Sequence, residues 1–461
     1  MAEKFRRQLR QEAQIWKSEG LISEEIYTQL SHRYQFDRLE EAASNRFIAV
    51  LVGLGAVLLG LGAITFVAAN WQGWPRSLKI ALLLFSLITS HSLGFYLWRF
   101  PSEQWQHRFG QGLLLLGTLL LGASLGLMSQ MFHLDGPIYQ LYLIWGLGVT
   151  GLAMSLRTPL LGFVSFVLMA LAYGSSLDDW LAPGGLPGIA GMLQHAPLIT
   201  GVVGIGLARW WNSRVIFTLM MVAFIPTVWI QLAAIGVWTV PLVVKVTLGL
   251  TLPPAFLWGY DDRAIAFGNF NHRPFQPIAR RLALLLIALQ LYLFSFHAWW
   301  NGWATWDRID DTLGGWRLSL DILALVGLTL WQWFQFSQSR RSGDRWRLDN
   351  SSLLVLNLLA ITCALFLWHS LIYPLPIFAP LIINIQIFLL AITFIRRGLK
   401  WGTRLGFWSG LVLLTGQIIS RMLEYDTGLL LKSIVFILCG LGVMAAGFWF
   451  EKQHQQSSGV G

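Results

Sequence analysis

Five residues between positions 122 and 133 have the types and the spacing of a hydrogen-bonding stripe on one face of a helix. At 100° per residue they fall within about 100° of arc. They are Gly122, Gly126, Ser129, Gln130 and His133. The two glycines form a GxxxG step, which allows close approach of membrane helices, and the polar residues follow at one end. The stripe indicates either a packed interface closed by structural hydrogen bonds or a surface that faces a substrate.

Ionisable side chains inside apolar segments are a second set of candidates, because a charge at the bilayer centre costs about 2.5 to 3.5 kcal/mol on insertion scales. His91 is the deepest of them. The others fall nearer the predicted outer ends of their segments: Lys245, His297, Asp321, His369, Arg421, Glu424 and Lys432. Such a bias would line an outward-facing cavity if the segments converge. Side chains near a membrane surface also extend to water at little cost, so both interpretations stay open.

The stretch "NWQGWPRSLK", residues 70–79, interrupts a long apolar run. Asn70 can cap a helix end, Trp71 suits a membrane interface, and Lys79 can reach that interface from inside a helix. Pro75 is a favourable residue for starting the next helix. The stretch is therefore either a simple turn at the membrane surface or a polar site at the same level as Gln130 and His133.

Several kinds of catalytic chemistry find no support. His133, His297 and His369 lack the spacing of a zinc site, and Cys363 and Cys439 lie singly in apolar runs. The sequence contains no P-loop, no GxSxG and no paired intramembrane carboxylates, which counts against an ATPase or a serine hydrolase. We expect no metal and no cofactor, and an enzyme is the less favoured interpretation.

The composition requires lipid as the solvent, since 55% of the residues are hydrophobic, only 12% are charged and 24 are Trp. The first 46 residues are charged throughout and show no cleavable signal peptide. The net charge of +10 is spread over short loops, so we attribute it to membrane topology and expect no nucleic-acid partner.

Apolar runs long enough to cross a bilayer predict an all-α integral membrane protein with fourteen transmembrane helices. The expected segments are 47–69, 78–98, 112–132, 138–156, 159–176, 190–208, 215–235, 238–259, 281–300, 318–337, 353–373, 376–395, 404–420 and 428–450. Gly53 and Gly60 give the first segment a small packing face, as Gly122 and Gly126 do for the third.

Lys and Arg test this assignment independently, because they collect in cytoplasmic loops. Of the 33 basic residues, 26 fall in the N-terminal tail, the C-terminal tail or every second loop. The remaining loops, among them 175–188 and 301–317, are acidic and rich in Gly and Trp. Both termini are therefore predicted in the cytoplasm, and the location is a bacterial inner membrane.

The tail is the one predicted soluble element, a cytosolic helical hairpin over residues 1–46. Gly20 suits the end of the first helix and Ser23 the start of the second. Its apolar residues are too few for independent stability, so we expect it to dock on a cytosolic protein partner. They are Ile15, Trp16, Ile26, Tyr27 and Leu30. The last residues, 451–461, are expected to be a disordered tail.

Three stretches resemble a known family in the same order: "WKSEGLISEE", "AANWQGWPRSLK" and "GASLGLMSQMFHLDGPIYQLYLIWGL". They are similar to the bacterial predicted membrane proteins defined by domain of unknown function 2157. The resemblance implies a multi-pass membrane protein with a cytosolic helical lead-in and lends no catalytic residue. It divides the membrane region into a family-like five-helix segment, 47–176, and a further nine-helix region, 177–450. Its motif positions fall on Asn70, Trp71, Lys79, Gln130, His133, Tyr139 and Trp145.

Three functions remain in view. The first is a carrier or flippase-like protein for a small or amphipathic solute, with a cavity near Asn70, Gln130, His133 and Lys245. The second is a membrane scaffold or sensor that recruits its partner through the hairpin. The third is a membrane enzyme acting on lipid-linked sugars, based on Asp307, Asp310 and Asp311. The identity of the substrate does not follow from the sequence.

Overall fold

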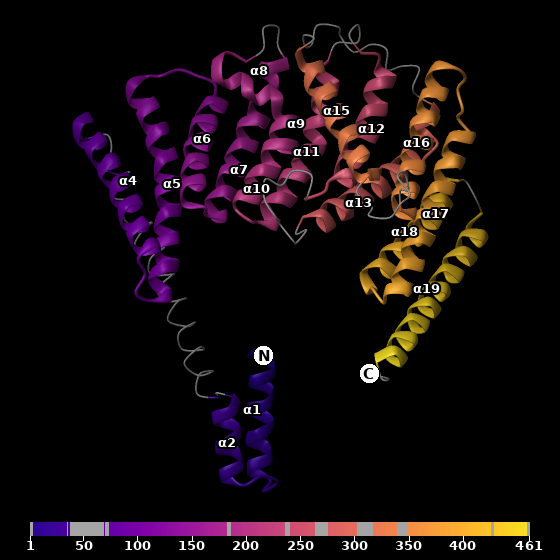
Figure 1. Cartoon of the computed structure of the whole chain (residues 1–461), viewed down its shortest axis with the longest axis horizontal. Coiled ribbons are helices and arrows are strands. Elements are labelled where there is room, and N and C mark those ends of the chain that lie inside the picture. The colour runs from indigo at the N-terminus through magenta and orange to yellow at the C-terminus, as the bar shows by residue number, and fades with distance from the viewer. Residues whose placement is uncertain are drawn as a thin grey trace. The chain divides into compact units, whose positions relative to one another are not determined.

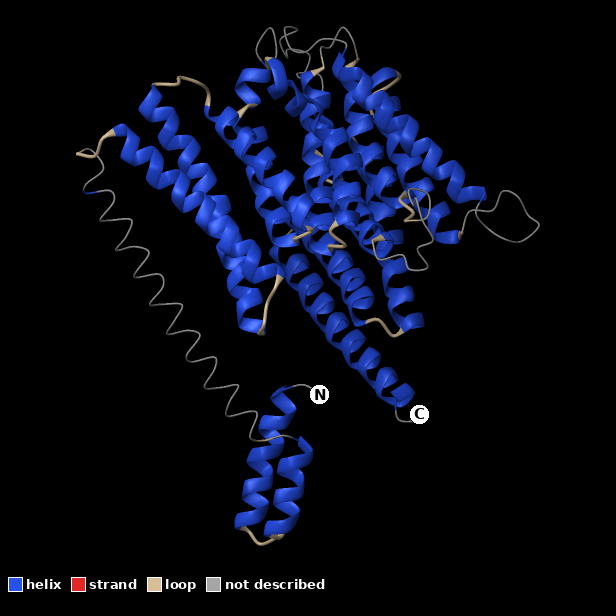
Figure 2. Cartoon of the chain, turned by 60° about the vertical axis from the view of Figure 1, so that its left-hand side comes forward, coloured by secondary structure: helices blue, strands red, loops and turns tan. Residues whose placement is uncertain are grey.

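The computed structural model of the chain is helical (Figures 1 and 2). It describes residues 3–34, 36, 69, 73–181, 186–235, 240–262, 275–301, 317–338, 349–425 and 428–458, and none of these residues forms a strand. Contacts divide the chain into two compact units, Met1–Thr89 and Ser90–Gly461. The boundary falls inside α4 (Arg76–Arg99), which begins directly after Pro75 as predicted.

The first unit contains the predicted hairpin, formed by α1 (Glu3–Ser18) and α2 (Glu24–Tyr34). Gly20 follows α1 with φ +74°, a left-handed conformation that glycine adopts without strain. Ser23 caps α2, because its hydroxyl accepts a hydrogen bond from the Ile26 N–H at 3.4 Å. The sequence therefore located both ends of the turn correctly.

The hairpin core differs in part from the prediction. Ala13 and Phe36 are its buried residues, and Trp16, Tyr27 and Leu30 pack against them together with Leu9, Ile22 and Tyr34. Ile15 and Ile26, which the sequence assigned to the same face, are 46% and 47% exposed. Leu9, Ala13 and Trp16 follow the helical spacing of one face, so Ile15 next to Trp16 points about 100° away from it.

The second unit is a bundle of long helices that follow one another along the chain (Figure 1). They are α5 (Gln104–Phe132), α6 (Ile138–Leu156), α7 (Pro159–Ser175), α11 (Arg214–Ala234), α12 (Leu242–Gly259), α13 (Gln276–Phe294), α15 (Arg317–Gln338), α16 (Asn350–Leu371), α17 (Phe378–Trp401), α18 (Arg404–Glu424) and α19 (Leu429–Ser458). Residues 188–210 form a further, discontinuous helix, and α8 (Leu177–Leu181) and α14 (Ala298–Asn301) are short.

Ten helices of the described residues are long and apolar enough to cross a membrane. They are α4, α5, α6, the discontinuous helix, α11, α12, α13, α16, α17 and α19. Every predicted segment from 78–98 onward coincides with one of these or with α7, α15 or α18. The predicted segment 47–69 lies outside the described residues. The last helix, α19, continues to Ser458, so residues 451–458 are helical where the sequence predicted disorder. Glu, Lys and Gln there are good helix formers.

The core of the bundle lies around α11, α12 and α13. Phe217 of α11 stacks on Phe275 with ring centroids 4.8 Å apart, and Phe224 packs on Phe256 of α12 at 4.9 Å. The helices α15, α16 and α17 pack around these three, and α6 pairs closely with α7. Many outward-facing apolar side chains are exposed, among them Phe85, Val215 and Leu430, as expected where lipid is the solvent.

An aspartate starts α16. The carboxylate of Asp349 accepts a hydrogen bond from the Ser352 N–H at 3.3 Å and one from the Ser352 hydroxyl at 2.5 Å. Burial raises the pKa of Asp349, but the hydrogen bonds from Ser352 and Ser351 and the charge of Arg280 outweigh burial. The pKa therefore lies below its usual value, and the cap stays ionised at neutral pH.

One of the two predicted packing glycines of α5 makes a close helix contact. A Cβ atom at Gly122 would lie 2.3 Å from the Trp145 indole of α6, whereas a Cβ at Gly126 would meet no atom within 4 Å. The indole N–H of Trp145 donates to the Thr118 carbonyl at 2.7 Å, which fixes the ring over Gly122. Gly53 and Gly60 lie outside the described residues.

We predict that Gly122→Ala lowers the stability of the purified protein by about 1 to 3 kcal/mol, because an added methyl group overpacks the α5–α6 contact. The measurement is the thermal unfolding midpoint in detergent, followed by intrinsic Trp fluorescence. Gly126→Ala is the matched control and should leave the midpoint unchanged or raise it, since alanine favours the helix. Equal losses in the two variants would show that the indole contact does not govern this packing.

Candidate functional site

The helix over residues 188–210 changes its hydrogen-bond pattern three times. It begins as the 3₁₀-helix η1 (Gly188–His195), passes through α9 (Ala196–Leu198) and the π-helix η2 (Ile199–Val203), and ends as α10 (Gly204–Trp210). Short π segments inside helices are frequent at functional sites. Discontinuous helices in membrane transporters likewise mark binding sites. The discontinuous helix is therefore a candidate functional site.

The local sequence explains the break. Pro197 has no N–H to continue the hydrogen-bond ladder at the start of α9. Gly201 and Gly204 let α11 approach closely, because a Cβ atom at these positions would lie 2.9 Å from Phe224 and from Met220. The Thr200 hydroxyl donates to the Ala196 carbonyl at 2.7 Å, and the Ile199 N–H donates to the same carbonyl.

The break places His195 against a buried carboxylate. Nδ1 of His195 lies 2.7 Å from Oδ2 of Asp321 on α15, and the Gln231 amide on α11 donates to the same oxygen at 2.8 Å. Asp321 is 5% exposed and Gln231 is fully buried, whereas the His195 side chain is 47% exposed. A buried carboxylate needs such hydrogen bonds, because desolvation of an unpaired charge is costly. We call these three residues the Asp321 cluster.

Lys245 is linked to the Asp321 cluster through the end of α11. Its ammonium group donates to the carbonyl of Ile235, the residue after α11, and the Ile235 N–H in turn bonds the Gln231 carbonyl at 3.2 Å. A cation at a helix C-terminus is favourable, because it complements the exposed carbonyls and the helix dipole. Lys245 is 5% exposed, so the structure buries this predicted cavity residue.

A second polar cluster joins α13, α17 and α18. Arg421 of α18 forms an ion pair with Glu424 and donates to the carbonyl of Ser295, which ends α13, at 2.7 Å. Glu424 also accepts from the His297 backbone N–H at 2.7 Å. Asn384 of α17 donates to the same Ser295 carbonyl at 3.3 Å. This arrangement closes the end of α13 and ties three helices together.

A third polar group secures the start of α13. Asp262 accepts hydrogen bonds from the N–H groups of Phe275 and Gln276 at 3.2 and 3.1 Å, and the Tyr260 hydroxyl donates to it at 2.7 Å. Arg209 donates to the Asp262 carbonyl at 3.0 Å. Burial and the neighbouring Asp262 carboxylate raise the pKa of Tyr260, which keeps this phenol in its hydrogen-bonding, neutral form. The group has a capping role.

The residues of the predicted stripe on α5 occupy different environments. Gln130 and His133 are exposed at the end of α5, where His133 ends the helix with φ +51°. Tyr139 is 3% exposed and Trp145 is the indole packed on Gly122. In Figure 1, α6, α7 and α11 lie between α5 and α12. Gln130 and His133 are thus not brought to Lys245.

Other predicted residues belong to packing or lie outside the described residues. The ring of His91 lies over Gly117, where a Cβ atom would meet it at 2.6 Å. His369 accepts a hydrogen bond from the Leu375 N–H at 2.8 Å. Lys79 lies in the second turn of α4 and is half-buried. Asn70 and Trp71 fall outside the described residues, as do Asp307, Asp310 and Asp311.

Sequence reasoning identified Asp321 and Lys245 as ionisable residues in spans but missed His195 and Gln231. His195 lies near the start of a predicted segment, where a polar residue is unremarkable. Gln231 carries no charge, so a search for ionisable residues passes over it. A signal was present, because Gln231 is the one amide in the apolar run from Phe217 to Ile235. No group of three or more His, Cys, Asp or Glu among the described residues could hold a metal ion.

The N-terminal third of the chain matches a known family. Residues 14–162 match the family described as predicted membrane protein (DUF2157). The match confirms the resemblance inferred from the three sequence stretches, and it covers α2 and α4 to α6 as well as part of α1 and the start of α7. The chain is thus a membrane protein of unknown function with many apolar helices. The comparisons with curated proteins and with solved structures find no match.

We predict that Arg421→Gln destabilises the protein by about 1 to 3 kcal/mol, because it leaves the partly buried Glu424 without its Arg421 partner. Thermal unfolding in detergent measures the loss. Arg214→Gln is the matched control: Arg214 starts α11 and is exposed, so this variant should unfold at the wild-type temperature. A wild-type midpoint for Arg421→Gln would show that the second cluster contributes no stability.

Proposed function

We propose that the protein is a carrier for a small or amphipathic solute and that the Asp321 cluster is its working site. The observation that supports this most is the buried Asp321 carboxylate, held by His195 at the break of a discontinuous helix. Ionisable groups inside spans are rare unless they serve a function, and broken helices supply substrate and ion sites in transporters.

The helix geometry around the break favours a carrier that changes conformation over a rigid scaffold. A scaffold needs only continuous helices, which satisfy every backbone group at no extra cost in lipid. Here one helix carries 3₁₀ and π segments, α11 beside it contains Pro226, and α12, which packs against α11 and α15, contains Pro253 and Pro254. Such positions lack a ladder hydrogen bond and allow bending. A polar site beside three interrupted helices suits alternating access.

We further propose fourteen membrane crossings with both termini in the cytoplasm of a bacterium and the chain in its inner membrane. Ten described helices are long and apolar enough, and α7, α15 and α18 supply three more helices in register with the predicted segments. The segment 47–69 supplies the fourteenth. Arg157, the pair Arg209 and Arg214, and the pair Arg396 and Arg397 lie at alternate helix ends, which supports this orientation. The Asp321 cluster is then at the outer end of the bundle.

Reporter fusions test this topology. Fusions of a fluorescent protein that matures only in the cytoplasm, placed after Arg340 and after Arg396, should both fluoresce. A fusion after Asp178 should not, because α8 would lie on the outer side. Alkaline phosphatase at the same three positions should give the opposite pattern. Opposite results for the Arg340 and Arg396 fusions would require an odd number of crossings between them and would exclude the proposed topology.

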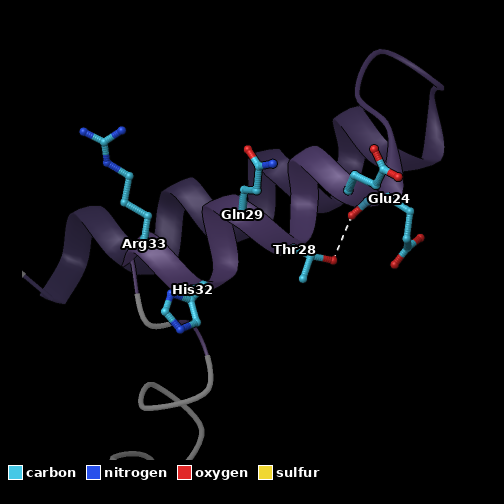
Figure 3. Close-up of a pocket in the computed structure, with 6 residues that line it drawn as sticks. Glu24, Thr28, Gln29, His32 and Arg33 are labelled. Carbon is cyan, nitrogen blue, oxygen red and sulfur yellow. Dashed lines mark hydrogen bonds between the residues drawn. The ribbon is translucent and has the colours of Figure 1, made fainter.

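A second candidate function is a scaffold or sensor, favoured by the folded hairpin. The hairpin has its own core, and a shallow depression on α2 is lined by exposed polar residues of both charges (Figure 3). These residues are Glu24, Glu25, Thr28, Gln29, His32 and Arg33. A cytosolic protein partner that presents mixed charges would fit this surface. The hairpin is compatible with a carrier as well as with a scaffold, so an experiment has to separate the two functions.

Uptake into proteoliposomes tests the carrier. The full-length chain is reconstituted and offered a panel of radiolabelled amino acids, sugars and organic cations and a fluorescent short-chain phospholipid. We expect at least one probe to be moved, and Asp321→Asn to lower its rate at least tenfold, since loss of the charge removes the centre of the cluster. Gln335→Asn, an exposed position on α15, is the control and should keep the wild-type rate.

Deletion of residues 1–46 separates the two functions. A carrier whose core inserts normally should keep moving the probe without the hairpin. If no probe is moved by the wild type, and a host growth phenotype depends on the hairpin but not on Asp321, the carrier proposal fails and the scaffold is favoured.

A further inference from the structure

The Asp321 cluster, if it works in the carrier proposed above, must respond to some ion or solute, and its donor atoms restrict which one. Two nitrogen atoms, Nδ1 of His195 and Nε2 of Gln231, lie 2.7 and 2.8 Å from a single carboxylate oxygen. Both nitrogens are placed as hydrogen-bond donors to an ionised Asp321. One oxygen of the carboxylate, Oδ2, therefore faces two N–H groups.

Such surroundings do not suit a metal cation. Hard cations are bound by several oxygen ligands, from carboxylates, carbonyls or water, and an N–H group directed at the same oxygen repels them. The oxygen of Asp321 already carries two donors, and the fully buried Gln231 side chain has no room to withdraw to solvent. A proton is the cation that this arrangement can accept without replacing a ligand.

The two titratable residues of the cluster differ in access. The His195 side chain is 47% exposed, whereas that of Asp321 is 7% exposed. Because Nδ1 of His195 faces Asp321, an added proton binds at Nε2, and the ring becomes a cation in contact with the carboxylate. Histidine titrates near neutral pH in its ordinary state, so a cell can use this change. His195 is the point of entry, and Asp321 is the buried counter-charge.

Among the described residues, few other charged groups lie on α15 or on the elements packed against it. These elements are α11, α12, α9 and η1. Their ionisable residues are Arg214, Lys245 and His195 itself, α9 has none, and α15 adds Arg317, one turn before Asp321. Arg214 starts α11, at the opposite end from Gln231, and the ammonium group of Lys245 bonds the Ile235 carbonyl. His195 is therefore the residue of this group that both contacts Asp321 and reaches solvent.

We propose that the coupling ion of this site is a proton, taken up by His195 from the outer aqueous phase and held against Asp321. With the proton bound, an imidazolium–carboxylate pair holds η1 on α15. With the proton released to water, a hydrogen bond from the neutral imidazole to the carboxylate remains, and η1 separates more readily. The π segment η2 and Pro197 lie directly after His195, so the discontinuous helix can change its position there without unfolding α10.

The sign of the pH effect follows directly. The ion pair exists only while His195 is protonated and Asp321 is ionised, so the attachment of η1 to α15 weakens when a rise in pH removes the proton from His195. The role of the proton as a coupling ion rests on the proposed carrier function, but protonation of His195 requires no solute. It is therefore measurable on the isolated protein.

Hydrogen–deuterium exchange provides the test. The full-length chain in lipid nanodiscs is followed by mass spectrometry between pH 5 and pH 8.5, with rates corrected for the intrinsic dependence of exchange on pH. We expect amides of residues 188–199 to lose protection at least tenfold as pH rises, with one midpoint. His195→Gln should remove this pH dependence and hold the segment in its less protected form at every pH.

Two further variants make the test specific. Asp321→Asn should also remove the pH dependence, since the counter-charge is gone. His107→Gln is the control, because His107 lies on α5, where its Nδ1 contacts the Trp98 carbonyl at 3.0 Å, and this variant should keep the wild-type profile. Protection of α11 amides reports whether each variant is folded. Since His195 is half exposed, its glutamine variant tests the proposal even if Asp321→Asn does not fold.

The outcomes separate this inference from the carrier proposal. A flat profile in the wild type, or a pH-dependent profile that survives His195→Gln, overturns proton binding at this site, whether or not the protein moves a solute. A titrating segment in a protein that moves none of the probes upholds the proton site and overturns only the carrier. If a probe is moved, uptake driven by an imposed pH gradient and abolished in His195→Gln supports both.

Discussion

The hydrocarbon of a bilayer offers no hydrogen-bond partner, and this constraint governs most of what the structure shows. Each polar group inside the bundle must find its partner on another part of the chain. Asp321 accepts hydrogen bonds from Gln231 and His195. Arg421 donates to the Ser295 carbonyl and forms an ion pair with Glu424. Arg421 and Glu424 share α18, but the bonds from Asp321 to Gln231 and His195 and from Arg421 to Ser295 join different helices, so these polar contacts help to fix which helices meet. Apolar packing alone would leave many arrangements of similar energy, since lipid tails solvate leucine as well as protein does.

The same constraint makes the break at residues 196–203 informative. A released backbone group in lipid costs several kcal/mol unless it is satisfied, so a broken helix persists only where its surroundings compensate. The Ala196 carbonyl at the break accepts from the Ile199 N–H and from the Thr200 hydroxyl, and Gly201 and Gly204 let Phe224 and Met220 of α11 pack closely there. A continuous helix would need none of these features. The sequence thus maintains an interrupted helix that places His195 on Asp321, and this supports the proposal that the contact is functional.

The fold was predictable from the sequence to the extent that its causes are local. Hydropathy located the helices from 78–98 onward, and Gly20 and Ser23 located the hairpin turn, because both signals depend on a few adjacent residues. The partners of Asp321 were not predictable, since Gln231 and His195 lie 90 and 126 positions away in the sequence. Helical periodicity placed Gly122 and Gly126 on one face. It could not show that only Gly122 meets the Trp145 indole, because that depends on where the neighbouring helix crosses.

The family match and the polar clusters occupy different parts of the chain. Residues 14–162 contain α2, α4, α5 and α6, where Tyr139, Trp145 and Gly122 serve packing. The Asp321 cluster and the Arg421 pair lie wholly beyond residue 162. Gln130 and His133 of the family motif are exposed at the end of α5, in contrast to the buried Asp321. A buried carboxylate with a half-exposed imidazole beside it can change charge while enclosed by the bundle. The helices outside the family match are therefore the better place to seek the activity, and the matched part supplies the hairpin and a packed edge of the bundle.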